Sequence, residues 1–227
     1  MSNSFLRQAC TQPFLTRTLL ELHLRAGCLE DERRNNSGQP FQPALDWIMH
    51  SKRGRARVLE KNHPQKWFLD FSSPLSRLCL VQTNDLLRVA DYLGLLLHAT
   101  DIARQITRQA VDRVTERFGK QGYTFALRRC RTLSVSRQSV AILRNKLTRH
   151  VAEETDIVDR VTRHGRMLVA DVLGENPPQL LERLNLPENL RPNEVFRLEA
   201  QEKEQAAALC YAILTREVAP QWAPYFP

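Results

Sequence analysis

The sequence predicts an all-α protein, and three observations lead to this prediction. Apolar residues recur every three or four positions through most of the chain, side chains suited to helix capping stand before several of these stretches, and no convincing alternating strand is present. The best strand candidate, Leu78 to Gln82, is short. We therefore expect a compact, irregular multi-helix domain with a less regular N-terminal third.

In the N-terminal third, a first helix is expected from Pro13 to about Ala26, since proline suits the first turn of a helix and Gly27 follows. A polar loop comes next. The segment 52–66 reads as a basic loop, and residues 67–71 form an apolar knot between two prolines.

The central helix is expected to start near residue 83, where Thr83, Asn84 and Asp85 offer capping side chains, and to end at His98. Its apolar residues cover most of the helix circumference: Leu86, Leu87, Ala90, Leu93, Leu95, Leu96 and Leu97. Gly94 costs about 1 kcal/mol relative to alanine inside a helix. This glycine predicts that another helix crosses closely at that point.

A second helix is expected after Thr100 and Asp101, with an apolar face at four-residue steps, and Gly119 and Gly122 end it. That face comprises Ile102, Ile106, Ala110, Val114 and Phe118. A short helix should follow from Tyr123 to Cys130.

Three later helices complete the prediction. One is capped by Ser134 or Ser136, and the next ends before the turn that begins at Gly174. The closing helix runs from Asn193, a possible cap, to Val218. The expected buried residues are Val140, Leu143, Leu147 and Val151, then Ile157, Val161, Leu168 and Val172, then Ala206, Leu209, Cys210, Ile213 and Leu214.

The expected domain organisation has two parts. Residues 1–82 supply the N-terminal helix, basic loop and apolar knot, which pack on a helical core domain of residues 83–227; alternatively, residues 1–227 form a single domain. The N-terminus lacks a signal-peptide pattern and no apolar run approaches the length of a membrane span, so a cytoplasmic location is expected.

The formal net charge of +8 is concentrated in one stretch. Residues 117–152 contain no acidic residue, whereas the chain from Glu175 onward leans acidic. The bases of the acid-free stretch are Arg117, Lys120, Arg128, Arg129, Arg131, Arg137, Arg144, Lys146 and Arg149. We expect a dipolar surface suited to charged partners.

Signatures of catalysis and of metal or cofactor binding are absent from the sequence. It contains no GxSxG, glycine-rich phosphate loop or HExxH motif, and the five cysteines are scattered, with Cys79 and Cys210 fitting buried apolar positions. His98 is expected to hydrogen-bond the last carbonyls of the central helix or to interact with the negative end of its dipole, and His150 and His164 to lie on a basic surface. The acidic cluster Glu153, Glu154, Asp156 and Asp159 reads as a solvated helix face. The sequence predicts a protein that is not an enzyme and has no cofactor.

Three pieces of the chain together resemble one protein family. They are the run from Leu93 to His98 with Ile102 to Arg104, the segment from Gly165 through Leu168 and Leu173 to Arg183–Pro187, and the end of the closing helix. In that end, Leu209 and Cys210 are followed by Val218, Ala219 and Pro220. Their order is similar to that of the SctK proteins, which include YscK, PscK, OrgA and MxiK.

This resemblance implies a non-enzymatic adaptor of the sorting platform of a bacterial type III secretion system, the virulence-associated injectisome. Such an adaptor is recruited to the cytoplasmic face of the inner membrane. There it links the pod protein SctQ to the cytoplasmic domain of the ring protein SctD, with SctL and SctN as indirect partners. Platform assembly and protein secretion would depend on it.

Two sets of residues are predicted to contact partners. The basic set is Arg128, Arg129, Arg131, Arg137 and Arg144, and the aromatic set is Trp222, Tyr225 and Phe226. The bases read equally well as solvated helix faces, and the aromatics as cover for the protein's own core. A basic helical nucleic-acid-binding or regulatory protein is the alternative function, because the acid-free stretch could neutralise several phosphates.

Overall fold

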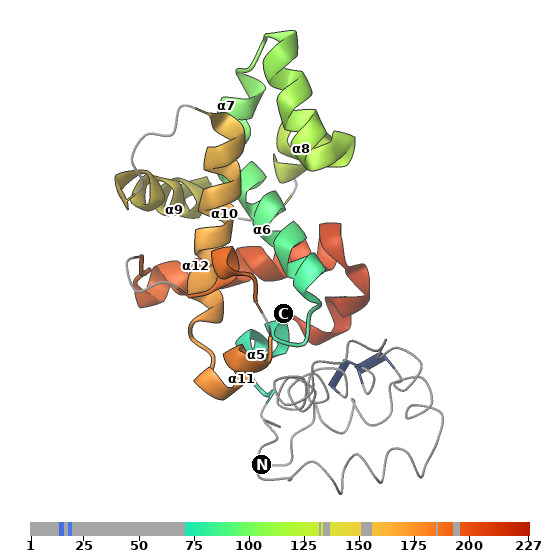
Figure 1. Cartoon of the computed structure of the whole chain (residues 1–227), viewed down its shortest axis with the longest axis vertical. Coiled ribbons are helices and arrows are strands. Elements are labelled where there is room, and N and C mark those ends of the chain that lie inside the picture. The colour runs from blue at the N-terminus through green and yellow to red at the C-terminus, as the bar shows by residue number, and fades with distance from the viewer. Residues whose placement is uncertain are drawn as a thin grey trace, which may run out of the picture. The chain divides into compact units, whose positions relative to one another are not determined.

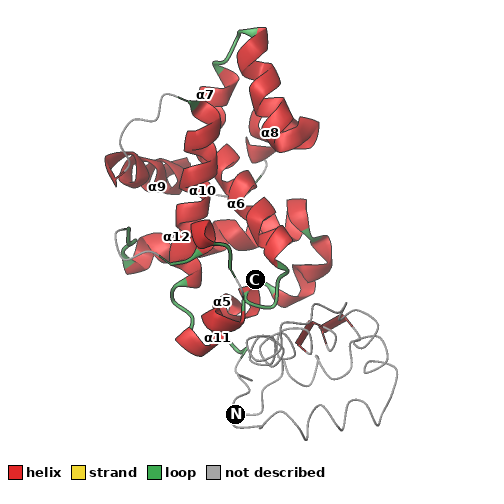
Figure 2. Cartoon of the chain, in the orientation of Figure 1, coloured by secondary structure: helices red, strands yellow, loops and turns green. Residues whose placement is uncertain are grey.

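The structure is a computed structural model, in which residues 14, 15, 18, 19, 71–131, 133, 137–150, 156–184, 186–192 and 196–227 are described. Every regular element among these residues is a helix, which confirms the all-α prediction (Figure 2). Residues 14, 15, 18 and 19 are helical. The rest of the predicted first helix, the basic loop, most of the apolar knot, and the caps at Ser134, Ser136 and Asn193 lie outside the described residues.

The chain divides into two units. Unit 1 comprises residues 1–81 and 176–185, and unit 2 comprises residues 82–175 and 186–227. The predicted core domain of residues 83–227 thus included a segment, 176–185, that the structure groups with unit 1. None of the helices in the described ranges combines the length and apolar character that a membrane crossing requires.

Unit 1 contains the short helices α5 (Pro74–Leu78) and α11 (Pro178–Arg183), each with a proline in its first turn. The hydroxyl of Ser73 caps α5 by accepting a hydrogen bond from the amide of Leu75. The short strand candidate at Leu78–Gln82 is not a strand, in agreement with the all-α prediction: the α5 helix ends at Leu78, and the amide of Val81 donates back to the Leu78 carbonyl in a turn.

Unit 2 is built around the crossing of α6 (Thr83–Leu97) and α10 (Ile157–Leu173), which pack on each other more extensively than any other pair of described helices (Figure 1). A Cβ atom on Gly94 would lie 2.0 Å from the carbonyl oxygen of Val161, and one on Gly165 would lie 1.9 Å from that of Ala90. The two backbones therefore touch at these glycines, and the close crossing predicted at Gly94 is confirmed.

The start of α6 differs from the prediction. Its N-cap is Gln82, which makes no side-chain capping hydrogen bond, and Thr83 is already the first helical residue. Asp85 stands in the first turn, where a carboxylate interacts favourably with the helix dipole. The apolar prediction for α6 is otherwise confirmed, with Leu86, Leu93 and Leu95 almost completely buried.

The predicted second helix is two helices in the structure. The α7 helix (Ala99–Ala103) is followed by a break, and α8 (Arg108–Leu127) begins after Thr107, whose hydroxyl accepts a hydrogen bond from the amide of Ala110. Ile106 falls in this break and is 93% exposed, so its predicted place in the apolar face is wrong. Gly119, with φ of 73° and ψ of 166°, is non-helical and interrupts α8 at a kink, so the break predicted there is confirmed, whereas Gly122 lies inside the helix.

The remaining helices of unit 2 are α9 (Arg137–His150) and α12 (Ala200–Ile213), which is extended by a π-helical turn, η4 (Leu214–Val218). The α12 helix packs on α6, α9 and α10. It starts later than predicted because Glu199 and Glu202 form a capping box at its N-terminus. Short 3₁₀ helices occur at η2 (Arg129–Arg131), η3 (Glu188–Leu190) and η5 (Pro220–Tyr225).

Candidate functional site

Four bases of the acid-free stretch are neutralised by carboxylates that other elements bring to them. Arg117 pairs with Asp91 of α6, Arg129 with Glu217 of η4, Arg144 with Asp101 of α7, and Lys146 with Glu202 of α12. The first three pairs have N···O distances of 3.3, 2.9 and 2.8 Å. The stretch that is purely basic in sequence is therefore not a continuous cationic surface in the fold.

The predicted basic contact residues consequently have different surroundings. Arg128 and Arg137 are exposed and make no ion pair within the described part of the chain. Arg129 and Arg144 are held by carboxylates, and the Arg144 side chain is 34% exposed. The side chain of Arg131 lies outside the described residues. The structure does not gather the five arginines into one site.

Adjacent arginines allow a direct test of this difference. Glu217 is 8% exposed, so removing its partner leaves a carboxylate poorly solvated. We expect Arg129→Ala to lower the free energy of unfolding by about 1–2 kcal/mol, a range that already allows for the solvent exposure of Arg129. Arg128→Ala should change it by less than about 0.5 kcal/mol. Urea denaturation measures both, and equal effects would contradict the assignment.

The predicted aromatic contact residues lie within the protein's own core. Trp222, Tyr225 and Phe226 are 2, 5 and 9% exposed. Phe226 stacks on Tyr211 of α12 with ring centroids 5.1 Å apart, and Trp222 meets both Tyr225 and Phe226 edge-on. Of the two readings of these residues, core packing is the one that accounts for their contacts.

A line of polar side chains runs through the interior of unit 2. Its members are Arg144, Asp101, His98 and His164 from α9, α7, the end of α6 and α10. The Arg144 guanidinium donates to Asp101 Oδ2 at 2.8 Å, this oxygen lies 3.2 Å from His98 Nδ1, and His98 Nε2 lies 2.9 Å from His164 Nδ1. Both histidines are 1% exposed.

These contacts indicate which ring nitrogens of His98 and His164 carry a proton. The Asp101 carboxylate accepts from His98 Nδ1–H, so the neutral His98 ring has a free acceptor at Nε2, which receives the Nδ1–H of His164. Burial lowers the pKa of His98, and burial together with the neighbouring positive groups lowers that of His164 to about 4. Both rings are therefore neutral near pH 7.

This arrangement corrects two predictions about histidine. The His98 ring binds Asp101 and His164 rather than the last carbonyls of α6, and His164 is buried rather than on a basic surface. Both rings are buried, so neither is accessible to a substrate from solvent. Across the described ranges, no group of three or more His, Cys, Asp or Glu side chains is placed to hold a metal ion.

Other polar and sulfur-bearing residues take structural positions. Asp156 caps α10 by accepting from the amide of Val158 at 2.7 Å, and also pairs with Arg113. Glu153 and Glu154 lie outside the described residues. The predicted burial of Cys79 and Cys210 is confirmed, and it raises the pKa of both thiols, that of Cys210 to about 12.

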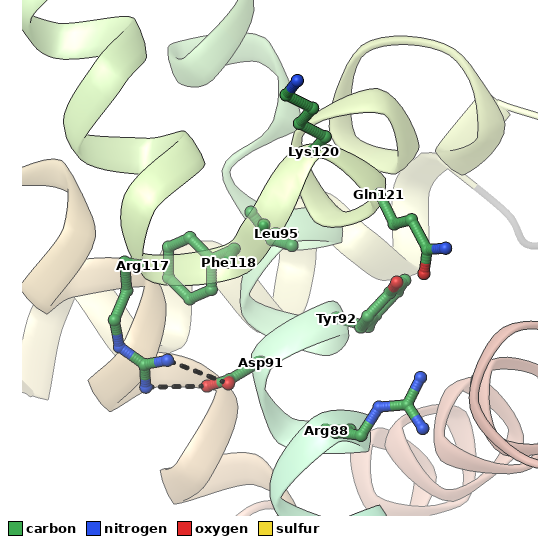
Figure 3. Close-up of a pocket in the computed structure, with 9 residues that line it drawn as sticks. Arg88, Asp91, Tyr92, Leu95, Arg117, Phe118, Lys120 and Gln121 are labelled. Atoms are coloured by element: carbon green, nitrogen blue, oxygen red, sulfur yellow. Dashed lines mark hydrogen bonds and ion pairs between the residues drawn. The ribbon is translucent and has the colours of Figure 1, made fainter.

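One open pocket, of about 290 Å³, lies between α6 and the kinked part of α8 (Figure 3). Its apolar lining consists of Tyr92, Leu95 and Phe118, and its polar lining of Arg88, Asp91, Arg117, Lys120 and Gln121. The two nitrogens of the Arg117 guanidinium each lie 3.3 Å from an Asp91 oxygen. The positive φ of Gly119, a conformation that favours glycine, turns the chain at the pocket wall.

The pocket has an excess of positive charge. Partial burial raises the pKa of Asp91, and the Arg117 and Arg166 guanidinium groups oppose that rise. The Asp91 charge is thus offset, whereas Arg88 and Lys120 remain at the rim. The sequence predicts the helix break at Gly119 but not this pocket, because the lining residues come from α6 and α8, which only the tertiary fold brings together.

The fold and its polar groups define an all-helical protein with a buried histidine pair and an open, cationic pocket. No family model, curated protein or solved structure matches the chain.

Proposed function

We propose that this protein is a non-enzymatic adaptor of a type III secretion sorting platform, similar to the SctK proteins, acting at the cytoplasmic face of the inner membrane. In this role it links an SctQ-like pod protein to the cytoplasmic domain of an SctD-like ring protein. SctL- and SctN-like components are then indirect partners.

The observation that supports the proposal most is where the pieces carrying the resemblance lie. The run Leu93–His98 is in α6, Gly165 and Leu168 are in α10, and Leu209 and Cys210 are in α12. These three helices pack on one another, and Leu93, Leu168 and Leu209 are completely buried. Residues from distant parts of the sequence thus share one core, as expected when a pattern reflects a common fold.

Binding and secretion assays test the proposal. We expect the purified full-length chain to retain SctQ- and SctD-like proteins from the same genome, and deletion of its gene to abolish platform assembly and secretion. Complementation with the wild-type gene should restore both. A chain that binds neither protein, or a deletion strain that still secretes, would refute the adaptor function.

Nucleic-acid binding is the less well supported function. This alternative depends on the nine lysine and arginine residues of the acid-free stretch, and four of these side chains are paired with carboxylates of the protein itself. Each phosphate contact that is lost makes the plot of the logarithm of the binding constant against the logarithm of salt concentration less steep by about 0.9. Strong, salt-sensitive binding to DNA or RNA, together with failure to bind either secretion protein, would favour this alternative.

A further inference from the structure

We propose that the pocket between α6 and α8 binds an acidic segment of a protein partner. In this arrangement an apolar side chain of the segment rests on the partly exposed ring of Phe118, and two carboxylates of the segment meet Arg88 and Lys120 (Figure 3). The inference rests on the proposed adaptor function and assigns it a contact surface that neither predicted set of residues provides.

The charges at the rim favour an anionic occupant. Arg117 is already engaged by Asp91, so these two charges largely cancel. The Arg88 side chain is 49% exposed, and its polar contacts with other described residues are long, 3.6 Å to an Asp85 oxygen and 3.4 Å to the Val218 carbonyl. Lys120 is exposed and has no ion pair within the described ranges. Both cations can turn to an incoming carboxylate without giving up a strong bond.

The aromatic side chains that line the pocket are held in place by packing against their neighbours. Tyr92 is 8% exposed and its ring packs against that of Phe125 with centroids 4.8 Å apart. The Arg117 guanidinium lies 5.0 Å from the centre of the Phe118 ring. A rigid aromatic lining beside arginine is typical of the places where protein interfaces gain most of their binding energy. A volume of about 290 Å³ is at the small end for ligand pockets and suits a protruding side chain.

The number of available cations favours a peptide over a nucleic acid. Tight nucleic-acid binding involves on the order of 6–10 phosphate contacts, whereas Arg88 and Lys120 can neutralise about two. Two carboxylates in an acidic segment match this pair without requiring a longer cationic track. Electrostatic complementarity of this local kind also increases the rate and selectivity of protein association.

Charge variants of the full-length chain test the inference. Lys120→Glu combined with Arg88→Gln is compared with Arg149→Glu combined with Gln138→Glu, which makes the same change in charge at exposed positions of α9. Binding to the purified SctQ-like protein and to the SctD-like cytoplasmic domain is measured by calorimetry. We expect the pocket variant to bind one of them more than 10-fold more weakly, the α9 variant to lose less than 3-fold, and neither to change the thermal unfolding midpoint appreciably.

Each other outcome overturns the inference in a recognisable way. Equal losses in both variants would indicate general electrostatic attraction, and unchanged binding in the pocket variant would place the interface elsewhere while leaving the adaptor function intact. Wild-type protein that binds neither partner overturns both proposals. If the pocket variant unfolds, Lys120→Glu alone replaces it, because that side chain is exposed and unpaired in the described structure.

Crosslinking identifies the occupant directly. Gln121 lies at the pocket (Figure 3) and is exposed, so a photoreactive amino acid can replace it without entering the core. With each purified partner, we expect the crosslinked peptide to contain aspartate or glutamate next to an apolar residue. A crosslink to a neutral or basic segment would contradict the inference.

Discussion

Replacing Gly165 with alanine should lower the free energy of unfolding by about 3 kcal/mol or more. The added methyl group would lie 1.9 Å from the carbonyl oxygen of Ala90 and 2.9 Å from the amide nitrogen of Gly94, and neither backbone atom can move aside alone. Alanine improves helix propensity by about 1 kcal/mol, but separating two packed helices costs more. Urea denaturation of both proteins measures the difference, and Gly94→Ala should behave similarly.

Gly174→Ala is the matched control for this prediction. Gly174 has a right-handed helical conformation. A Cβ atom added to it would lie 3.1 Å from the Cβ of Pro192, which is a close contact that a small shift can relieve. We expect its effect to stay below about 1 kcal/mol, since the gain in backbone propensity offsets the crowding. A Gly165→Ala protein as stable as Gly174→Ala would show that α6 and α10 do not touch at this point.

Acidification should destabilise the protein through the buried histidine pair. The pKa of His164 is about 4 in the folded protein against 6.5 for an unperturbed histidine, so the unfolded chain binds a proton that the folded chain excludes. The stabilisation is complete above pH 6.5 and is lost progressively as the pH falls towards 4, by up to ~3 kcal/mol. The lowered pKa of His98 acts in the same direction.

The His164→Gln variant isolates this effect. Glutamine retains a donor for His98 Nε2 but does not titrate, so the free energy of unfolding should depend less steeply on pH between 6.5 and 4. The raised pKa values of Asp85, Asp91 and Asp171 act in the opposite direction, and they are common to both proteins. Parallel pH profiles for wild type and variant would contradict the prediction.

Local patterns were sufficient to predict the helical core. The three- and four-residue spacing identified Leu143, Leu168 and Leu209, all of which are completely buried. Gly94 also predicted the close crossing correctly, because a glycine inside an apolar helix is costly unless a neighbouring backbone needs the space.

The predictions that failed involve competition between similar local signals or contacts across the fold. Thr100, Asp101 and Thr107 are all suitable caps, and only the tertiary arrangement selects Thr107 as the start of α8. Asp101, which binds Arg144, is 43 residues away from it, and His98 and His164 are 66 residues apart. No spacing rule relates such pairs, so a basic stretch and two isolated histidines could not be recognised as paired groups.

The crossing of α6 and α10 also defines what a distant relative must retain. The carbonyls of Val161 and Ala90 leave no room for a side chain at Gly94 and Gly165, and the bonded His98 and His164 follow and precede these glycines by four residues and one residue. A homologue therefore needs a small residue four positions before a polar partner in one helix, and a polar–small pair in the other. The residues at these four positions are therefore expected to covary. A substitution at one of them should be accompanied by a compensating one on the facing helix, and this pairing would identify relatives whose sequences have otherwise diverged.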